Sequence, residues 1–155
     1  MKVFKFIIAL VLPLLVGGIA GIFTSQSVTE WYSTLNKPSF NPPDWIFGPV
    51  WTVLYLLMGI SFFIIWLKPA DGNRNRAILV FLIQLLLNFG WSFFFFYFEM
   101  IAAALIEIII LWLSILVMIL LFYRINRPAA LLQIPYLLWV SFAAVLNGAI
   151  FFLNN

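Results

Sequence analysis

The side chains best suited to chemistry in this sequence share one face of an apolar stretch, residues 77–97. That face carries two amides, an indole, a hydroxyl and a phenyl ring: Gln84, Asn88, Trp91, Ser92 and Phe95. The offsets of 4, 7, 8 and 11 residues place all five on one side of an α-helix. An apolar wall with a few convergent polar groups is typical of a small-molecule pocket.

Three further apolar stretches carry a similar face. In residues 45–67 and 130–152, large and small residues recur at steps of four: Phe47, Trp51, Tyr55 and Gly59, then Pro135, Trp139, Ala143 and Asn147. Residues 5–24 carry Pro13, Gly17, Gly21 and Thr24. Two interpretations are open, a ligand pocket or the packing of helices through small residues and polar contacts. We expect packing to account for the glycines and the large rings to favour a pocket.

The residue types that are missing exclude most conventional catalysis. The chain has no histidine and no cysteine, so a Ser-His-Asp triad, thiolate nucleophiles and the usual zinc ligands are excluded. Glu107 is the one acidic residue inside an apolar stretch, and without a second carboxylate it has no partner for acid–base catalysis. We expect Glu107 to be exposed, or to contact another helix or another subunit. We predict neither a metal site nor an obligatory cofactor.

The elements that must position these residues are membrane helices. The 155 residues are 66% hydrophobic and 8% charged, whereas soluble domains are about 25% charged. A helix needs about 20 apolar residues to cross a bilayer, and five stretches qualify: 5–24, 45–67, 77–97, 101–122 and 130–152. We therefore predict an all-α integral membrane protein, in which residues 1–155 form one domain, a bundle of five transmembrane helices.

Positive charge predicts the orientation of the bundle. Seven of the eight basic residues lie on one side, at the N-terminus and in the second and fourth connections, and only Lys37 lies on the other. Because lysine and arginine are enriched in cytoplasmic loops, we expect a cytoplasmic N-terminus, with the first loop and the C-terminus outside. A net charge of +3 without a basic run also argues against binding to nucleic acid.

The first connection, residues 25–44, is the only long one. It leads into KPSFNPPDWIFGPVW, residues 37–51, where four prolines alternate with aromatic residues. Proline keeps the chain out of helix and restricts the preceding residue. We expect a stiff lid over the mouth of the bundle, and we expect Asp44 to cap the second helix.

Three segments together resemble the TspO/MBR family, also called translocator proteins or tryptophan-rich sensory proteins. The segments are WYSTLNKPSFNPPDWIFGPVWTVLY, QLLLNFGWSFFFF and IPYLLWVSFAAVLN. The resemblance covers essentially the whole chain and implies a membrane receptor, sensor or carrier, commonly a homodimer, that binds porphyrins such as protoporphyrin IX or haem and drug-like hydrophobic molecules. The porphyrin would be a ligand or a substrate and not an obligatory cofactor.

By motif position, the resemblance implies a set of ligand-binding residues: Tyr32, Pro42, Phe47, Trp51, Tyr55, Asn88, Trp91, Ser92, Phe95, Trp139, Ala143 and Asn147. It also implicates Trp51 and Trp139 as catalytic residues in an alternative activity, the light-dependent breakdown of porphyrin. A structural adaptor without a ligand is a third hypothesis. The sequence departs from animal members after Asn147, where LNGAIFFLNN has neither tyrosine nor a basic residue. We therefore expect a bacterial cell-membrane protein without the animal pattern proposed for cholesterol.

Overall fold

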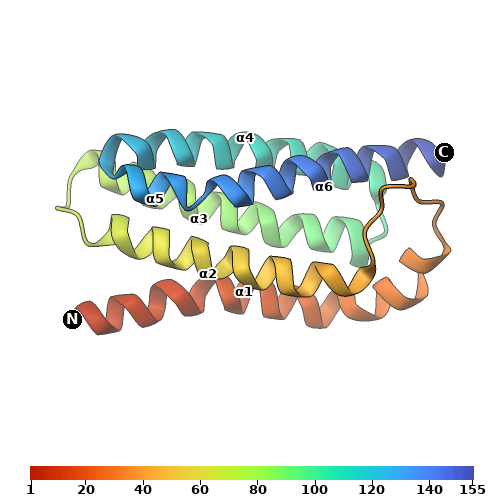
Figure 1. Ribbon diagram of the computed structural model, residues 1–155, viewed down its shortest axis with the longest axis horizontal. Coiled ribbons are helices and arrows are strands. Elements are labelled where there is room, and N and C mark those ends of the chain that lie inside the picture. Colours follow the sequence, from red (N-terminus) through yellow and green to blue (C-terminus); the bar gives the residue numbers. More distant parts are fainter.

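The computed structural model describes residues 1–155 and is entirely helical. The long helices are α1 (Lys2–Glu30), α2 (Phe47–Trp66), α3 (Gly72–Ser92), α4 (Ile101–Ile125) and α6 (Ile134–Leu153), with a short α5 at Arg127–Leu131. Two 3₁₀ turns, η1 (Tyr32–Thr34) and η2 (Asp44–Ile46), and a π-helical turn, η3 (Phe93–Tyr97), complete the chain. Five segments are long and apolar enough to cross a membrane, which confirms the predicted five-helix membrane bundle (Figure 1).

The first helix is longer than predicted. Residues 25–30 continue α1, and η1 follows at once, so the first connection is non-helical mainly over residues 35–43. Polar side chains make this extension possible by bonding along the helix. Ser25 donates to the carbonyl of Ile22, and the Gln26 amide donates to the Glu30 carboxylate at 3.1 Å. The predicted lid of residues 25–44 is therefore too long at its N-terminal side.

The predicted cap at Asp44 is wrong. Asp44 opens the 3₁₀ turn η2, and neither η2 nor α2 has a side-chain cap. The capping residues of α3 and α5 are instead Asp71, which accepts from the amide of Arg74 at 2.7 Å, and Asn126, which accepts from that of Ala129 at 3.0 Å. Each satisfies an amide that has no partner within its own helix.

The fifth span is two helices and not one. We predicted a continuous segment over 130–152, but the chain leaves α5 after Leu131 and enters α6 at Ile134. Pro135 explains the break, because it has no amide proton and its ring would clash with the carbonyl four residues earlier. The break lets α5 pack against α2, where Ser61 donates to the carbonyl of Ala129 at 2.6 Å.

Helices α1 and α2 approach each other closely at one glycine. A Cβ atom added to Gly59 would lie 2.7 Å from the carbonyl oxygen of Ala9 and 2.9 Å from the Cα atom of Leu10. The Ala9 carbonyl has lost its usual helical donor, because that donor would be the amide of Pro13. The packing role predicted for Gly59 is confirmed, since only glycine allows this contact.

Helices α4 and α1 lie at opposite edges of the bundle (Figure 1). Helix α4 packs on α3 and α6, while α1 packs on α2 and on the turn η3. The two chain ends lie at opposite ends of the bundle, and the segment between α1 and α2 closes the end where α6 finishes (Figure 1). A core cluster that includes Met58, Phe81 and Tyr136 fills the other half of the bundle. This arrangement leaves room between α1, α2, α3 and α6 at the closed end.

Candidate ligand-binding site

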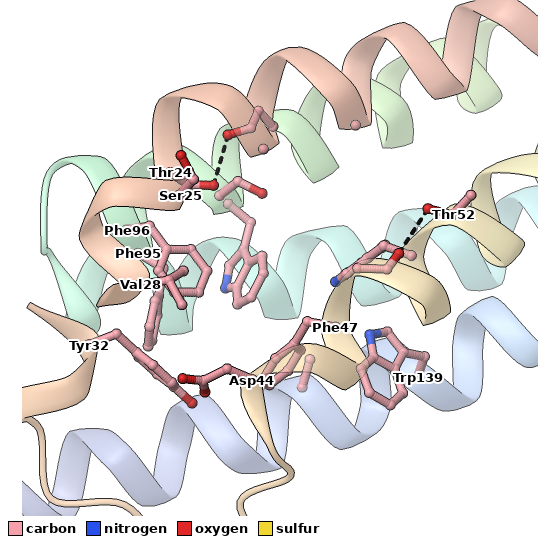
Figure 2. Close-up of a pocket in the computed structure, with 18 of the residues that line it drawn as sticks. Thr24, Ser25, Val28, Tyr32, Asp44, Phe47, Thr52, Phe95, Phe96 and Trp139 are labelled. Carbon is pink, nitrogen blue, oxygen red and sulfur yellow. Dashed lines mark hydrogen bonds between the residues drawn. The ribbon is translucent and has the colours of Figure 1, made fainter. Parts of the chain in front are cut away.

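A cavity of about 500 Å³ lies between α1, α2, the end of α3 with η3, and α6. Helix α4 contributes no lining residue. Ten of the twelve predicted ligand-binding residues line it: Tyr32, Phe47, Trp51, Tyr55, Trp91, Ser92, Phe95, Trp139, Ala143 and Asn147. Figure 2 shows Phe47 between Asp44 and Trp139 in the wall of the cavity. The structure thus brings together the faces of four spans that the spacing had marked.

Aromatic rings form most of the cavity wall. Trp51 stacks on Tyr55 with ring centroids 5.6 Å apart and planes inclined by 27°. Phe47 meets Trp139 edge to face at 6.0 Å, and Trp91 lies 5.6 Å from Phe95. Such pairs hold one another in place and add about 0.5–1.5 kcal/mol beyond the burial of their surface. The aromatic rings are therefore already held in fixed orientations in the wall of the cavity.

A buried hydrogen-bond chain forms the floor. Tyr55 donates its hydroxyl proton to Asn88 Oδ1 at 2.7 Å, and Asn88 Nδ2 donates to the Tyr136 hydroxyl at 3.0 Å. Tyr136 in turn donates to Gln84 Oε1 at 2.7 Å. This chain corrects the placement of Asn88, which was predicted to bind the ligand but does not line the cavity. Trp91 lines the cavity, whereas Asn88, one turn earlier on α3, does not. Asn88 instead holds the Tyr55 hydroxyl by a hydrogen bond, and Tyr55 is the residue that lines the cavity.

Two indole groups differ in their hydrogen bonding. Trp91 Nε1 donates to Asn147 Oδ1 at 3.1 Å, and Asn147 Nδ2 donates to the carbonyl of Ile101 at 3.2 Å. The amide of Asn147 is therefore already engaged. Trp139 Nε1 is buried in the cavity wall without an acceptor, although its ring stands beside the cavity (Figure 2). An unpaired buried donor costs about 1–3 kcal/mol.

The mouth combines polar groups with an anchored loop. Tyr32 is buried and donates to Asn41 Oδ1 at 2.7 Å, and Lys37 Nζ lies 4.9 Å from the centre of the Tyr32 ring. Asn154 at the end of α6 holds the loop by pairing with both backbone groups of Asn36, each at 2.9 Å.

Pro42 does not line the cavity. The loop over residues 35–43 crosses toward α6, so Pro42 shapes the loop while Tyr32 and Asp44 on either side reach inward. The predicted lid is thus present in a shorter form, and the residues beside it that line the cavity are Tyr32 of η1 and Asp44 of η2.

Sequence reasoning assigned the glycines of α1 to helix packing, yet α1 forms one wall of the cavity. Its small and polar residues face the space: Gly17, Gly18, Ala20, Gly21, Thr24 and Ser25. A Cβ atom added to Gly21 would meet nothing within 4 Å, whereas one added to Gly17 would overlap the Tyr55 ring. The packing role predicted for Gly21 is wrong, and that for Gly17 is confirmed. Four-residue spacing alone cannot separate a glycine that admits a ring from one that leaves space.

Three other side chains have positions that only the structure shows. Phe96 lies outside the predicted stripe but lines the cavity next to Phe95, in the π-helical turn η3. Glu107 is buried against α3, with Oε1 3.5 Å from the position of a Cβ at Gly90. Of the expected environments for Glu107, contact with another helix is the one observed. Trp112 donates to Ser141 Oγ at 2.7 Å and so joins α4 to α6.

The fold and this cavity define a class: an integral membrane protein with five spans and an aromatic-walled cavity between the helices near one end of the bundle. Residues 9–153 match the TspO/MBR family, and the chain belongs to that family. It is 43% identical over 147 residues to the tryptophan-rich protein TspO of Chlorobaculum tepidum, covering 92% of this chain and 91% of that protein. It is 41% identical over 154 residues to TspO of Archaeoglobus fulgidus, covering 99% of each. The translocator protein of Bos taurus is 33% identical over 139 residues, which cover 88% of this chain and 82% of the bovine protein.

Proposed function

We propose that this protein is a membrane receptor or sensor that binds porphyrins of the protoporphyrin class in the cavity between α1, α2, α3 and α6. The observation that carries the proposal is the cavity itself. Its volume, about 500 Å³, lies within the range of roughly 300–1,000 Å³ typical of small-molecule sites. Its walls are the faces of aromatic rings, which suit a flat conjugated macrocycle.

The polar groups of the site suit the edge of such a plate. Trp139 Nε1 lacks an acceptor within the protein, and a ligand oxygen at the wall would supply one after a small rotation of the ring. Lys37 is the one basic residue at this end of the bundle, and it lies beside Tyr32 at the mouth. A carboxylate at the ligand edge would pair with this ammonium group. Metal-free porphyrin suits a chain without histidine better than haem does.

Titration of the purified protein with protoporphyrin IX, followed by quenching of tryptophan fluorescence, tests the proposal. Trp139→Phe keeps an aromatic ring and removes the N–H group, so we expect roughly tenfold weaker binding, the value of one hydrogen bond of about 1.4 kcal/mol. Trp66→Phe is the matched control, because Trp66 packs on Phe62 away from the cavity. Equal affinities for the wild type and for both variants would contradict the site.

The role of Lys37 at the mouth of the cavity can be tested by comparing two ligands. Protoporphyrin IX dimethyl ester has the same macrocycle without carboxylates. Lys37→Gln should weaken binding of the free acid by several-fold and leave binding of the ester unchanged, because only the acid gains from the ammonium group. An equal loss for both ligands would show that Lys37 acts through the structure of the loop and not through charge.

Light-dependent porphyrin breakdown is a second candidate, favoured by one observation: Trp51 and Trp139 both line the cavity. Dioxygen would be the oxidant, and the excited porphyrin would be the species oxidised. Illumination of the complex in air should convert the porphyrin band into a defined product, and Trp51→Phe should abolish the conversion. Bleaching at the same rate with and without protein would leave binding as the function.

Orientation and assembly are further parts of the proposal. We infer that residues 35–43 and the C-terminus face outward from a bacterial cell membrane, and that the protein forms a homodimer. The chain has no cysteine, so in a variant with one introduced cysteine any maleimide label on this protein is attached at that position. A membrane-impermeant maleimide should label Ser39→Cys in intact cells and spare Asn73→Cys. The reverse pattern would overturn the orientation, and a monomer by mass in detergent would contradict the dimer.

A further inference from the structure

A second, basic cavity lies at the opposite end of the bundle from the aromatic one. It has a volume of about 160 Å³ and is lined by five residues: Asn73, Arg76, Leu121, Arg124 and Ile125. Arg76 lies in the second turn of α3, and Arg124 is next to the last residue of α4. These two helices pack on each other, so two arginines from distant parts of the sequence line one hollow.

The charge of this hollow is not neutralised by the protein. Its lining contains two arginines and no acidic residue. Asp71 is the one acidic side chain at this end, and its carboxylate caps α3 by accepting from the amide of Arg74. Arg74 itself is engaged, because it donates to the carbonyl of Lys68 at 3.1 Å. Two arginines that line one hollow without such partners suit a phosphate group, whose oxygens accept paired N–H bonds from guanidinium groups.

The surface that leads away from the arginines is apolar. On α3, exposed aliphatic residues follow Arg76 at steps of three and four, and on α4 a similar row precedes Arg124: Leu79, Ile83 and Leu86, then Leu120, Val117 and Leu113. Both rows lie within segments apolar enough to cross a membrane. A molecule with its phosphate in the hollow would therefore have hydrocarbon-compatible surface directly beside it.

We propose that the cavity between Arg76 and Arg124 binds the phosphate headgroup of an anionic phospholipid, with the acyl chains along the exposed rows of α3 and α4. A free phosphate would use the same two arginines but would not use the apolar rows. A second copy of the chain, packed symmetrically through this face, would bring four arginines together and repel. Basic pockets between membrane helices are known to hold anionic headgroups. The site is independent of the porphyrin cavity and does not rest on that proposal.

Native mass spectrometry of the protein released from detergent micelles tests the assignment. The probes are phosphatidylglycerol and phosphatidylcholine with identical acyl chains, and inorganic phosphate. We expect the wild type to retain phosphatidylglycerol preferentially. The variant Arg76→Gln/Arg124→Gln should lose that preference by roughly tenfold or more, because each cation near the headgroup contributes several-fold to affinity. Lys2→Gln/Lys68→Gln is the matched control, since it removes the same charge at the same end outside the cavity.

Each outcome decides the proposal. An equal loss in both double variants would mean diffuse attraction by surface charge and would overturn the site, as would an unchanged preference in the arginine variant. Displacement of the lipid by millimolar phosphate, with equal binding of phosphate alone, would assign a free anion instead. If the arginine variant does not fold, photo-crosslinking of wild-type protein with a headgroup-labelled phosphatidylglycerol decides: adducts should map to peptides containing residues 73–76 or 121–125, and adducts elsewhere overturn the site.

Discussion

Replacement of Gly17 by alanine should destabilise the protein through one side chain, Tyr55. The added methyl group would overlap the Tyr55 ring, with Cδ2 only 2.6 Å and Cζ 2.8 Å away. The ring cannot simply turn aside, because it stacks on Trp51 and its hydroxyl is bonded to the buried amide of Asn88. The substitution must therefore shift α1 away from α2 or break the bond at the cavity floor.

The expected size of the effect follows from three contributions. Overpacking of a filled contact costs about 1–3 kcal/mol, and a weakened interhelical hydrogen bond within the membrane adds about 0.6–1.7 kcal/mol. The change from glycine to alanine in a helix offsets about 1 kcal/mol of this cost. We expect the free energy of unfolding to fall by about 1–4 kcal/mol. Circular dichroism during titration of the micelles with sodium dodecyl sulfate measures it.

Gly21 supplies a matched control on the same helix. A methyl group there meets no atom within 4 Å, so Gly21→Ala should leave the free energy of unfolding unchanged or raise it by up to about 1 kcal/mol. The cost of Gly17→Ala should also largely disappear when Tyr55 is already leucine, because the two positions interact directly. Equal effects of Gly17→Ala and Gly21→Ala, or an unchanged cost in the Tyr55→Leu background, would refute the reasoning.

Three further predictions concern the floor, the loop and a turn. Asn88→Leu leaves the hydroxyls of Tyr55 and Tyr136 without their shared partner, so the free energy of unfolding should fall by about 1–3 kcal/mol, and porphyrin titration should show a smaller loss of affinity than for Trp139→Phe. Asn154→Ala removes both bonds to the backbone of Asn36, so hydrogen exchange at residues 35–41 should accelerate while the helices keep their protection; unchanged exchange would exclude Asn154 as the anchor. Glu99 has a φ of 57° in the turn between η3 and α4, a conformation that favours glycine; Glu99→Gly should raise the thermal midpoint, corresponding to about 1 kcal/mol, and a lower midpoint would show that the Glu99 side chain stabilises the turn.

Much of the fold could be predicted because the bilayer imposes simple rules on a sequence. Five apolar stretches of sufficient length predict five helices, since a chain in hydrocarbon must satisfy its own backbone hydrogen bonds. The boundaries were less predictable. Residues 25–30 are polar enough to be read as loop, yet they continue α1 by local side-chain bonds. The break before Pro135 was visible in the sequence as a proline, but a kink and a break are both compatible with that residue.

The sequence by itself determined which side of each helix carries the aromatic and polar residues. The periodicity places Trp51, Trp91 and Trp139 on those sides of three helices. Only the tertiary structure decided which of these sides enclose space. Asn88 shares the stripe of Trp91 but lies behind Tyr55. Gly21, which had been assigned to packing, and Phe96, which belongs to no stripe, both line the cavity. The physical reason is that a helical stripe fixes a direction on one helix, while a cavity depends on the separation and rotation of four. Those quantities are set by contacts between helices, such as Gly59 on Ala9 and the Tyr55 ring against Gly17.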